Sequence, residues 1–415
     1  MKFGIKCNIM YNAMIWGSQI KKYQKRKDIM EILLEIWSKI LALFDGTTSM
    51  DFTSEVIPMV IMWAFGGLLI YLAIAKDMEP TLLLPMGFGT ILVNLPLAEL
   101  VGVISEEGAI RILYDAGIAN ELFPLLLFIG IGAMIDFGPL LSNPKLMIFG
   151  AAAQFGIFFT LAMATLFGFP IKEAASIAVI GAADGPTSIY VANVLKSENI
   201  GAIIVAAYSY MALVPMVQPP VIKALTTKKE RKIRMKYEGK AVSKRTKILF
   251  PIFVTIIVGL VSQQSVALVG FLMFGNLIRE CGVLDSLSET AQKVLANLVT
   301  ILLGITVATN MNAEKFLKEE TFIILGLGLV AFVFDTAGGV LFAKFLNIFL
   351  PKDKKINPMI GAAGISAFPM SSRVVHKMGL EEDNQNFLLM HATGVNVSGQ
   401  IASVIAGGMI LNFFG

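Results

Sequence analysis

The chain has 415 residues, of which 56% are hydrophobic and 15% charged, and its mean hydropathy is +0.73. Soluble domains carry about 25% charged residues, so this composition excludes a soluble class and indicates a membrane protein. The net charge is +4, from 34 Lys and Arg against 30 Asp and Glu. Cys7 and Cys281 lie far apart without a CxxC spacing, so the sequence suggests neither a disulfide framework nor a zinc site.

Residues 1–50 are expected to form a basic tail and an interfacial amphipathic helix. From residue 29 to residue 44, apolar side chains repeat at helical spacing opposite Glu31, Glu35 and Lys39. The first 28 residues contain no apolar core and no small-residue cleavage site, which argues against a signal peptide. Met30 is an alternative start of the chain.

The rest of the chain is predicted to be all-α and to cross a membrane many times. Seven apolar windows carry one formal charge or none: 54–75, 120–135, 146–168, 199–222, 248–278, 321–343 and 387–415. Several reach the roughly 20 residues that span a bilayer. Shorter apolar pieces lie at 80–96, 171–195, 294–309 and 356–372. We therefore expect a polytopic membrane protein of about eleven or twelve segments.

A basic loop separates two apolar regions, 51–222 and 248–415. Residues 223–247 hold eleven Lys or Arg against two Glu, which predicts a cytoplasmic location for this loop. The loop either only orients the chain or also serves as a docking surface.

Two regions of the chain resemble each other at a nearly constant offset. The ten residues from Gly181 to Tyr190, GAADGPTSIY, have a counterpart in the GAAGISAFPM sequence from Gly361 to Met370. The offset is 180 residues for this pair, 186 for Phe88-Gly89 against Phe274-Gly275, and 176 for residues 131–136 against 307–312. Offsets this similar, in the same order, indicate duplicated halves.

Both repeated segments contain helix breakers near the middle. Gly185-Pro186 interrupts residues 171–195, and Gly364 and Pro369 interrupt the second segment. Paired broken segments in two halves are typical of a transport site. If each segment folds back as a re-entrant hairpin, the first half has five spans. Because five is an odd number, the second half then enters the membrane from the opposite side and is inverted relative to the first. The predicted fold is therefore two inverted repeats with paired broken or re-entrant helices.

Asp184 is the strongest candidate for a functional residue. An acid inside an apolar stretch is costly unless it is paired, protonated or bound to a cation. No Lys or Arg is adjacent to Asp184. The helix breaks beside it leave backbone carbonyl oxygens without helical hydrogen-bond partners. A cation or a proton is therefore the expected partner, and a purely structural aspartate is the alternative.

Other polar residues in apolar surroundings are weaker candidates. Arg373 either binds an anion through two parallel hydrogen bonds or snorkels to the interface. Tyr208 and Tyr210 can donate a proton or a hydrogen bond in a dry site, or belong to an interfacial aromatic belt. Asn396 offers oxygen to sodium or a hydrogen bond between helices.

Asp136 is expected at an interface. Asp335 lies deeper, with Lys344 as a possible ion-pair partner.

Several energy-coupling motifs are absent from the sequence. There is no GxxxxGK[ST] phosphate-binding loop, no dinucleotide fingerprint and no biotin-acceptor sequence of the Ala-Met-Lys-Met type. Energy must then come from an ion gradient or from the chemistry of a partner.

From about Glu55 to the end, the chain resembles the β subunits of the biotin-dependent, sodium-pumping decarboxylases, which act on oxaloacetate, methylmalonyl-CoA, glutaconyl-CoA or malonate. Five ordered motifs carry the resemblance: DGPT at 184–187, AYSYMALVP at 207–215, QPP at 218–220, NFLLMH at 386–391 and GVNVSG at 394–399. Residues 1–50 depart from the short N-terminus of the family.

The resemblance implies roles for particular residues. The family pattern matches Asp184, Tyr210, Asn357, Gly361, Ser366, Arg373 and Asn396. It implies that sodium is held by Asp184, Asn396 and the stretch that contains Asn357, Gly361 and Ser366. It also implies that Tyr210 and Arg373 lie near the carboxybiotin or the proton route, so that Asp184, Tyr210, Ser366 and Arg373 form the catalytic set.

The resemblance implies a bacterial inner-membrane subunit that decarboxylates carboxybiotin, exports sodium and consumes a proton. The implied partners are a biotin carrier protein, a carboxyltransferase α subunit, a small single-span γ subunit and further copies of the chain. The main alternative is a secondary sodium-coupled carboxylate transporter without enzymatic activity. A passive ion channel fits less well, because channels rarely need two matched broken segments.

Overall fold

A computed structural model describes residues 56–96, 108–236, 241–351 and 354–415. The chain divides into two units, 1–57 and 58–415, and almost every described residue belongs to the second. The expected basic tail and interfacial helix of residues 1–50 lie outside the described residues. Every regular element in the described part of the chain is helical, which confirms the all-α prediction.

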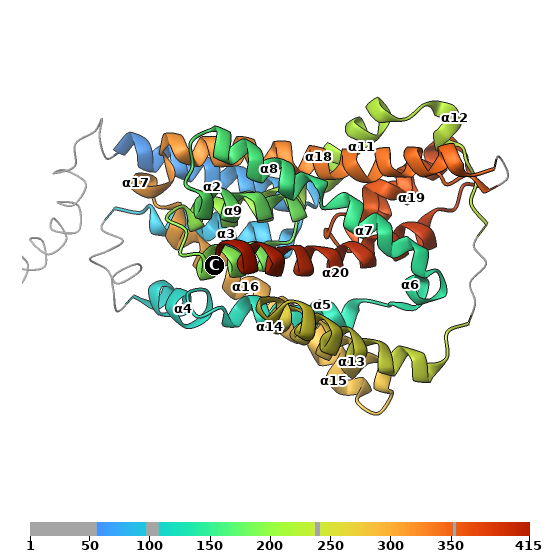
Figure 1. The fold of residues 1–415 in the computed structure, drawn as a ribbon. Coiled ribbons are helices and arrows are strands. Elements are labelled where there is room, and N and C mark those ends of the chain that lie inside the picture. The colour runs from blue at the N-terminus through green and yellow to red at the C-terminus, as the bar shows by residue number, and fades with distance from the viewer. Residues whose placement is uncertain (1–55, 97–107, 237–240, 352–353) are drawn as a thin grey trace, which may run out of the picture. The chain divides into compact units, whose positions relative to one another are not determined.

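The first repeat begins with α2 and ends with the long helix α11 (Figure 1). Its elements are α2 (Ile57–Lys76), α3 (Pro80–Val93), α4 (Ala109–Gly117), α5 (Leu122–Met134), α6 (Gly138–Ser142), η2 (Pro144–Leu146), α7 (Met147–Ala153), α8 (Phe155–Leu166), α9 (Ile171–Ala178), η3 (Val179–Ala182), α10 (Gly185–Val194) and α11 (Ile200–Leu225). The short helix α12 (Lys228–Arg231) follows in the basic loop. The segment that contains Asp184 is therefore broken between η3 and α10, as its Gly-Pro pair predicts.

The second repeat contains the longest helix, α18, and the C-terminal helix α20. Its elements are α13 (Lys244–Val261), η4 (Gln263–Ser265), α14 (Val266–Cys281), α15 (Asp285–Glu289), the π-helical turn η5 (Thr290–Leu295), α16 (Ala296–Val307), η6 (Ala308–Met311), α17 (Ala313–Phe316), α18 (Glu319–Phe349), η8 (Pro358–Gly364), α19 (Met370–Glu382) and α20 (Leu389–Phe414). The second broken segment comprises η8, an irregular stretch at 365–369, and α19.

Six helices of the described chain are long and apolar enough to cross a membrane. The pair α4–α5, bent by 65°, is either a seventh, broken span or a re-entrant loop. The other predicted segments are shorter or broken, so the count of eleven or twelve stays a prediction. Large apolar side chains such as Leu166, Leu260 and Ile348 are exposed, as expected of surfaces that face lipid. The protein is a multi-pass membrane protein.

Glycines allow the helices of the two repeats to pack closely. The backbone of Gly132 in α5 lies against the carbonyl group of Leu272 in α14, and Gly275 in α14 lies against the carbonyl group of Ile129 in α5. Helices in a membrane associate through such small residues because lipid offers no hydrophobic drive for association. In the same way α18 packs against α8, α11 and η8, and α20 packs against α7 and η8. These contacts join the two halves around the broken segments.

Candidate functional site

Asp184 begins α10 at the break in the first repeated segment. Ala183, just before it, has a left-handed backbone with φ of 51°, and Asp184 itself is extended with φ of −126°. Gly185 and Pro186 then occupy the first helical positions, where the missing N–H of proline costs nothing. The local sequence thus stops one helix, turns the chain and starts another, with Asp184 as the N-cap.

The Asp184 carboxylate is almost completely buried and is held by neutral donors. Its side chain is 3% exposed. The hydroxyl groups of Thr187 and Ser403 donate hydrogen bonds to Oδ2 over 2.8 and 3.0 Å, and the backbone N–H of Thr187 donates to Oδ1 over 3.4 Å. No described residue forms an ion pair with it. A buried carboxylate without a balancing charge is stable only when protonated or bound to a cation.

Helix α20 presents a polar stripe to the two broken segments. Asn396, Gln400 and Ser403 are spaced four and three residues apart, so they share one face of the helix. The Asn396 amide donates to the carbonyl oxygen of Ile365 over 2.7 Å, and the Gln400 amide donates to the carbonyl oxygen of Ser366. The remaining oxygens, Asn396 Oδ1 and Gln400 Oε1, are buried without a hydrogen-bond partner.

Ser366 links the second broken segment to the first. Its backbone N–H donates to the carbonyl oxygen of Ala182 over 3.1 Å, and its hydroxyl donates to the carbonyl oxygen of Gly399 over 3.1 Å. The broken parts of the two repeated segments therefore contact each other directly. Whether either segment is re-entrant stays a prediction.

The chemistry of this group suits a small cation with few charged ligands. It offers one carboxylate, two buried amide oxygens without partners, and hydroxyl groups from Thr187 and Ser403. Transition metals favour clusters of His, Cys, Asp or Glu, and the described residues contain no group of three or more such side chains. One carboxylate balances one monovalent cation or one proton.

Gly361 lies within η8, and Asn357 lies at the start of η8. Gly361 packs backbone to backbone against Gly339 of α18, and a side chain on either glycine would overlap the other's carbonyl group. Asn357 is completely buried, its Oδ1 accepts from the N–H of Met359 over 3.1 Å, and its amide donates to the carbonyl oxygens of Arg231 and Ile233. The Asn357 side chain therefore bonds to the basic loop and not to the group around Asp184.

Part of the basic loop is fastened across the second repeat. We call residues 226–236 the strap. Arg231 is 6% exposed and pairs with Glu382 of α19 over 2.6 Å, and Arg234 pairs with Asp383 over 2.7 Å. The amide of Asn386 also donates to the Arg231 carbonyl oxygen over 2.9 Å. The loop thus does more than carry charge, because its N-terminal part is packed onto α19 and η8.

The two tyrosines of α11 face different neighbours. The hydroxyl of Tyr210 donates to the carbonyl oxygen of Leu325 in α18, and its ring lies against Gly328. The Tyr208 ring lies against Gly185, next to Asp184, and its hydroxyl is buried without a hydrogen-bond partner. Tyr208 is therefore the tyrosine that packs beside the carboxylate.

Arg373 lines an exposed groove on α19. The groove has a volume of about 460 Å³ and is lined by Arg373, His376, Lys377, Leu380, Glu381 and Leu389. Arg373, Lys377 and Glu381 repeat at a spacing of four residues and so follow one face of the helix. The groove therefore combines two cationic side chains and the carboxylate of Glu381 with apolar walls.

Two weaker expectations have clear outcomes. Asp136 accepts from the N–H of Gly138 over 2.8 Å and pairs with Lys247 over 3.3 Å, beyond the end of α5, which agrees with a place at an interface. The expected pair between Asp335 and Lys344 is wrong. Lys344 instead pairs with Glu230 over 3.3 Å, because nine residues of helix separate the two positions by about 13 Å.

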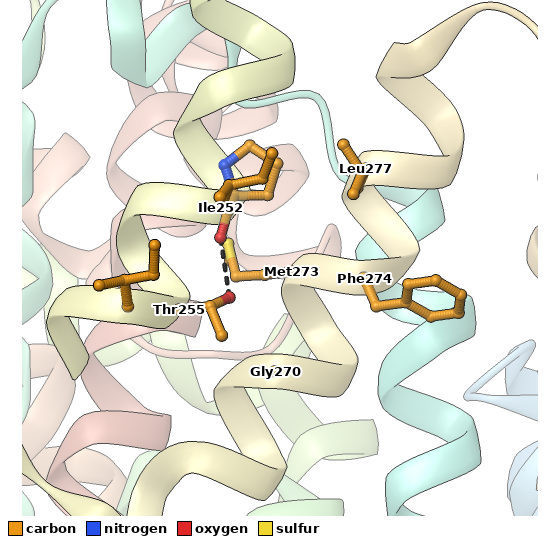
Figure 2. Close-up of a pocket in the computed structure, with 8 residues that line it drawn as sticks. Ile252, Thr255, Gly270, Met273, Phe274 and Leu277 are labelled. Carbon is orange, nitrogen blue, oxygen red and sulfur yellow. Dashed lines mark hydrogen bonds between the residues drawn. The ribbon is translucent and has the colours of Figure 1, made fainter. Parts of the chain in front are cut away.

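A second groove carries none of these chemical features. Figure 2 shows it between α13 and α14, with a volume of about 270 Å³ and an apolar lining that includes Ile252, Met273 and Phe274. Its polar side chain, Thr255, donates to the carbonyl oxygen of Pro251 over 2.8 Å, within its own helix. Such a surface fits lipid chains and indicates no catalytic role.

Sequence reasoning missed Gln400, Ser403 and the role of Thr187. Thr187 follows Asp184 at the capping distance of three residues, so its backbone bond was legible in the sequence. Gln400 and Ser403 continue the helical spacing from Asn396, which marks a polar stripe on an apolar helix. That stripe was the available signal.

Comparisons with known proteins identify the family of the chain. The family model "Na+-transporting oxaloacetate decarboxylase beta subunit" matches residues 58–414. The chain is 48% identical to the methylmalonyl-CoA decarboxylase subunit beta of Propionigenium modestum, over 90% of this chain and 99% of the relative. It is 50% identical to the subunit of that name from Veillonella parvula, over 85% and 92%. It is 46% identical to the oxaloacetate decarboxylase beta chain of Klebsiella pneumoniae, over 85% and 94%.

These matches cover nearly all of the second structural unit, including both broken segments and α20. The chain therefore belongs to the family of the sodium-transporting oxaloacetate decarboxylase β subunits, and it is a multi-pass bacterial membrane subunit of a sodium-transporting decarboxylase.

Proposed function

We propose that this chain decarboxylates a carboxybiotin carried by a partner subunit, exports sodium in the same cycle and consumes one proton. The observation that carries the proposal is the buried Asp184 carboxylate, bonded to neutral donors, one of which is Ser403 on the same face of α20 as two buried amide oxygens without partners. Membership of the family implies dependence on sodium and biotin and a complex of several subunits.

Sodium, the transported ion, would be held between the two broken segments. The Asp184 carboxylate supplies the balancing charge, and Asn396 Oδ1 and Gln400 Oε1 supply neutral oxygens. Ser366, Thr187 and Ser403 keep these groups in place through their hydrogen bonds. We propose that Asn357 and Gly361 act on this site indirectly, because Asn357 ties η8 to the strap and Gly361 locks η8 against α18.

The groove at Arg373 fits a carboxylated ring system. Arg373 keeps its charge at every relevant pH and offers a planar pair of donors to a carboxylate. Leu380 and Leu389 supply apolar walls, and Lys377 adds a second cation. When bound, carboxybiotin supplies the bond whose cleavage releases carbon dioxide. The chain's own residues orient the carboxylate and supply the proton that the biotin then takes up, and Tyr210 lies on the proposed proton route.

The partners follow from this division of labour. A biotin carrier protein must deliver the carboxyl group, a carboxyltransferase α subunit must load it, and a small single-span γ subunit completes the proposed complex. We also propose that the chain forms a homo-oligomer. The choice of acyl substrate belongs to the carboxyltransferase, since the described residues of this chain need to recognise only the carboxylated biotin.

The test is decarboxylation of free carboxybiotin by the purified full chain in lipid vesicles, measured against sodium concentration. The parent chain should release carbon dioxide faster as sodium rises, and Asp184→Asn should lose this dependence, because the amide lacks the charge that offsets the lost hydration of sodium. The control is Asp115→Asn, which removes an exposed carboxylate paired with Arg111 over 3.0 Å. Sodium-stimulated turnover that survives in Asp184→Asn at the level of the control would exclude this role.

A further inference from the structure

A second carboxyl group, that of Asp335, is buried in the middle of α18, and no step proposed above uses it. Its side chain is 0% exposed. Oδ1 accepts a hydrogen bond from the backbone N–H of Gly156. Oδ2 is buried without any hydrogen-bond partner. One oxygen is thus satisfied and the other is not.

The donors come from an interruption inside a single membrane span. Residues Pro144–Leu166 are long and apolar enough to cross the membrane as one unit, but α7 ends at Ala153 and α8 begins at Phe155. The first N–H groups of a helix have no partner within it, and they carry a partial positive charge. Gly156 presents such a group to Oδ1. The break in the span therefore provides the site for one carboxyl oxygen.

Oδ2 lies against the backbone of the first broken segment. An ideal Cβ built on Gly181 in η3 would be 3.0 Å from Oδ2, so only a glycine leaves ordinary space there. Gly156 is equally constrained, because its Cβ would overlap Oδ1. The Asp335 carboxyl group therefore touches α8 and η3 of the first repeat from α18 of the second. Asp184 follows Gly181 by three residues. η3 therefore contacts one buried acid, Asp335, and immediately precedes the segment that carries the other, Asp184.

No charged side chain in the described chain balances Asp335. Lys344, on the same helix, pairs with Glu230. From α11, Tyr210 is bonded to the carbonyl oxygen of Leu325, ten residues earlier on α18, which corresponds to about 15 Å of helix. From η3, the nearest titratable group along the chain is Asp184 itself, and α8 presents no titratable side chain. An ionised Asp335 would thus be a buried charge without a counter-ion, which is costly.

A sodium ion does not fit this site as well as a proton does. Sodium requires several oxygen ligands, whereas Oδ1 already accepts from the Gly156 N–H and the space at Oδ2 is closed by Gly181. A proton needs only a lone pair on Oδ2, where it completes a neutral carboxylic acid. We propose that Asp335 is an intramembrane proton-binding site, separate from the proposed sodium site and protonated while η3 packs against it.

The position of the site links its proton to the movement of the first broken segment. With η3 against Oδ2, the proton is sealed from water. If η3 moves away during transport, Oδ2 is uncovered and the proton can leave. Protonation and the packed conformation therefore favour each other, as any two linked equilibria must. This coupling rests on the proposed function, but the protonation itself does not and is tested separately.

The test is infrared difference spectroscopy of the full chain in lipid vesicles, in potassium salts without sodium, as the pH is raised. The parent should show a carboxylic acid band that disappears with increasing pH. Without sodium Asp184 is also expected to be protonated, so the decisive comparison is made in Asp184→Asn. Asp184→Asn should retain the band, and the double variant Asp184→Asn/Asp335→Asn should lack it, since an amide keeps the acceptor for Gly156 but cannot titrate. Loss of the band in Asp184→Asn, or its persistence in the double variant, overturns the proposal.

A second variant keeps the carboxyl group and changes its surroundings. Gly181→Ala places a methyl group 3.0 Å from Oδ2, which excludes water from the ionised form. The band should then disappear at a higher pH than in the parent. The control is Gly67→Ala, since a Cβ at Gly67 meets nothing within 4 Å. An identical transition in Gly181→Ala and in the control would also overturn the proposal, and this arm applies even if Asp335→Asn fails to fold.

Discussion

The backbone N–H of Ser366 donates a hydrogen bond to the carbonyl oxygen of Ala182 over 3.1 Å. Ala182 lies two residues before Asp184, and Ser366 lies in the irregular stretch between η8 and α19. The broken ends of two segments that are 180 residues apart in the sequence are thus joined directly. A helix break leaves backbone groups without hydrogen-bond partners in their own helix. This contact brings such groups from the two breaks together, as in the discontinuous helices that form ion sites in membranes.

Arg373→Lys distinguishes a substrate ligand from an interfacial anchor. If Arg373 holds a carboxylate through two parallel bonds, lysine should fail almost as badly as alanine, because an ammonium group cannot reproduce a planar two-bond contact. With hydrogen bonds to charged groups worth about 1.5–3 kcal/mol each, we expect at least a roughly tenfold loss of free carboxybiotin decarboxylation at saturating sodium. Sodium binding, measured in parallel, should be retained. Near-parental activity of Arg373→Lys would remove this residue from the substrate site.

Gly339→Ala tests the backbone contact between α18 and η8. The new methyl group would overlap the Gly361 carbonyl, and overpacking of this kind typically costs about 1–3 kcal/mol. We expect a lower thermal midpoint in detergent and weaker sodium stimulation. Gly326→Ala is the matched control, because it lies in the same helix with nothing within 4 Å of its Cβ. Equal midpoints for the two variants would contradict the importance of this contact.

Asn357→Ala should loosen the strap. The substitution removes the Asn357 donor from the carbonyl oxygens of Arg231 and Ile233. The Arg231 oxygen keeps its bond from Asn386, and the loss at Ile233 costs about 1–3 kcal/mol. We expect faster tryptic cleavage within residues 226–236 of the purified chain. Asn412→Ala, which removes a bond to the Ser262 hydroxyl, should leave this cleavage rate unchanged. If both variants are cut at the parental rate, Asn357 does not hold the strap.

The Asp136–Lys247 pair should make a small, pH-dependent contribution to stability. Burial disfavours the ionised form of Asp136, but the Gly138 N–H and the Lys247 ammonium outweigh it and hold the pKa of Asp136 below its ordinary value of 3.8. The stabilisation is therefore present above pH 3.8 and is lost as the pH falls through the lowered folded-state value.

Unfolding in detergent should show Asp136→Asn less stable than the parent by about 0–1 kcal/mol at pH 7, since this pair is half-exposed. The difference should shrink as the solution is made more acid. A difference that grows on acidification would mean that another group is responsible.

The sequence by itself determined the environment and the local breaks of this protein. Apolar windows long enough to span a bilayer follow from composition alone, because lipid tolerates few charges. The break at Asp184 follows from Gly185-Pro186, because proline removes a donor and restricts the preceding residue. The repeat offset of 180 residues marked a second break, and the structure joins the two breaks through Ser366.

Only the tertiary structure decided which side chains surround each buried acid. Ser403 donates to Asp184 across 219 residues, and Gly156 donates to Asp335 across 179. Helical spacing identifies a polar face on α20 but does not say which helix that face meets, since packing among apolar helices depends on the shapes of all their surfaces. For the same reason Asn357, matched to a sodium ligand by its motif, is found bonded to the strap. Contacts between distant segments are a property of the whole fold.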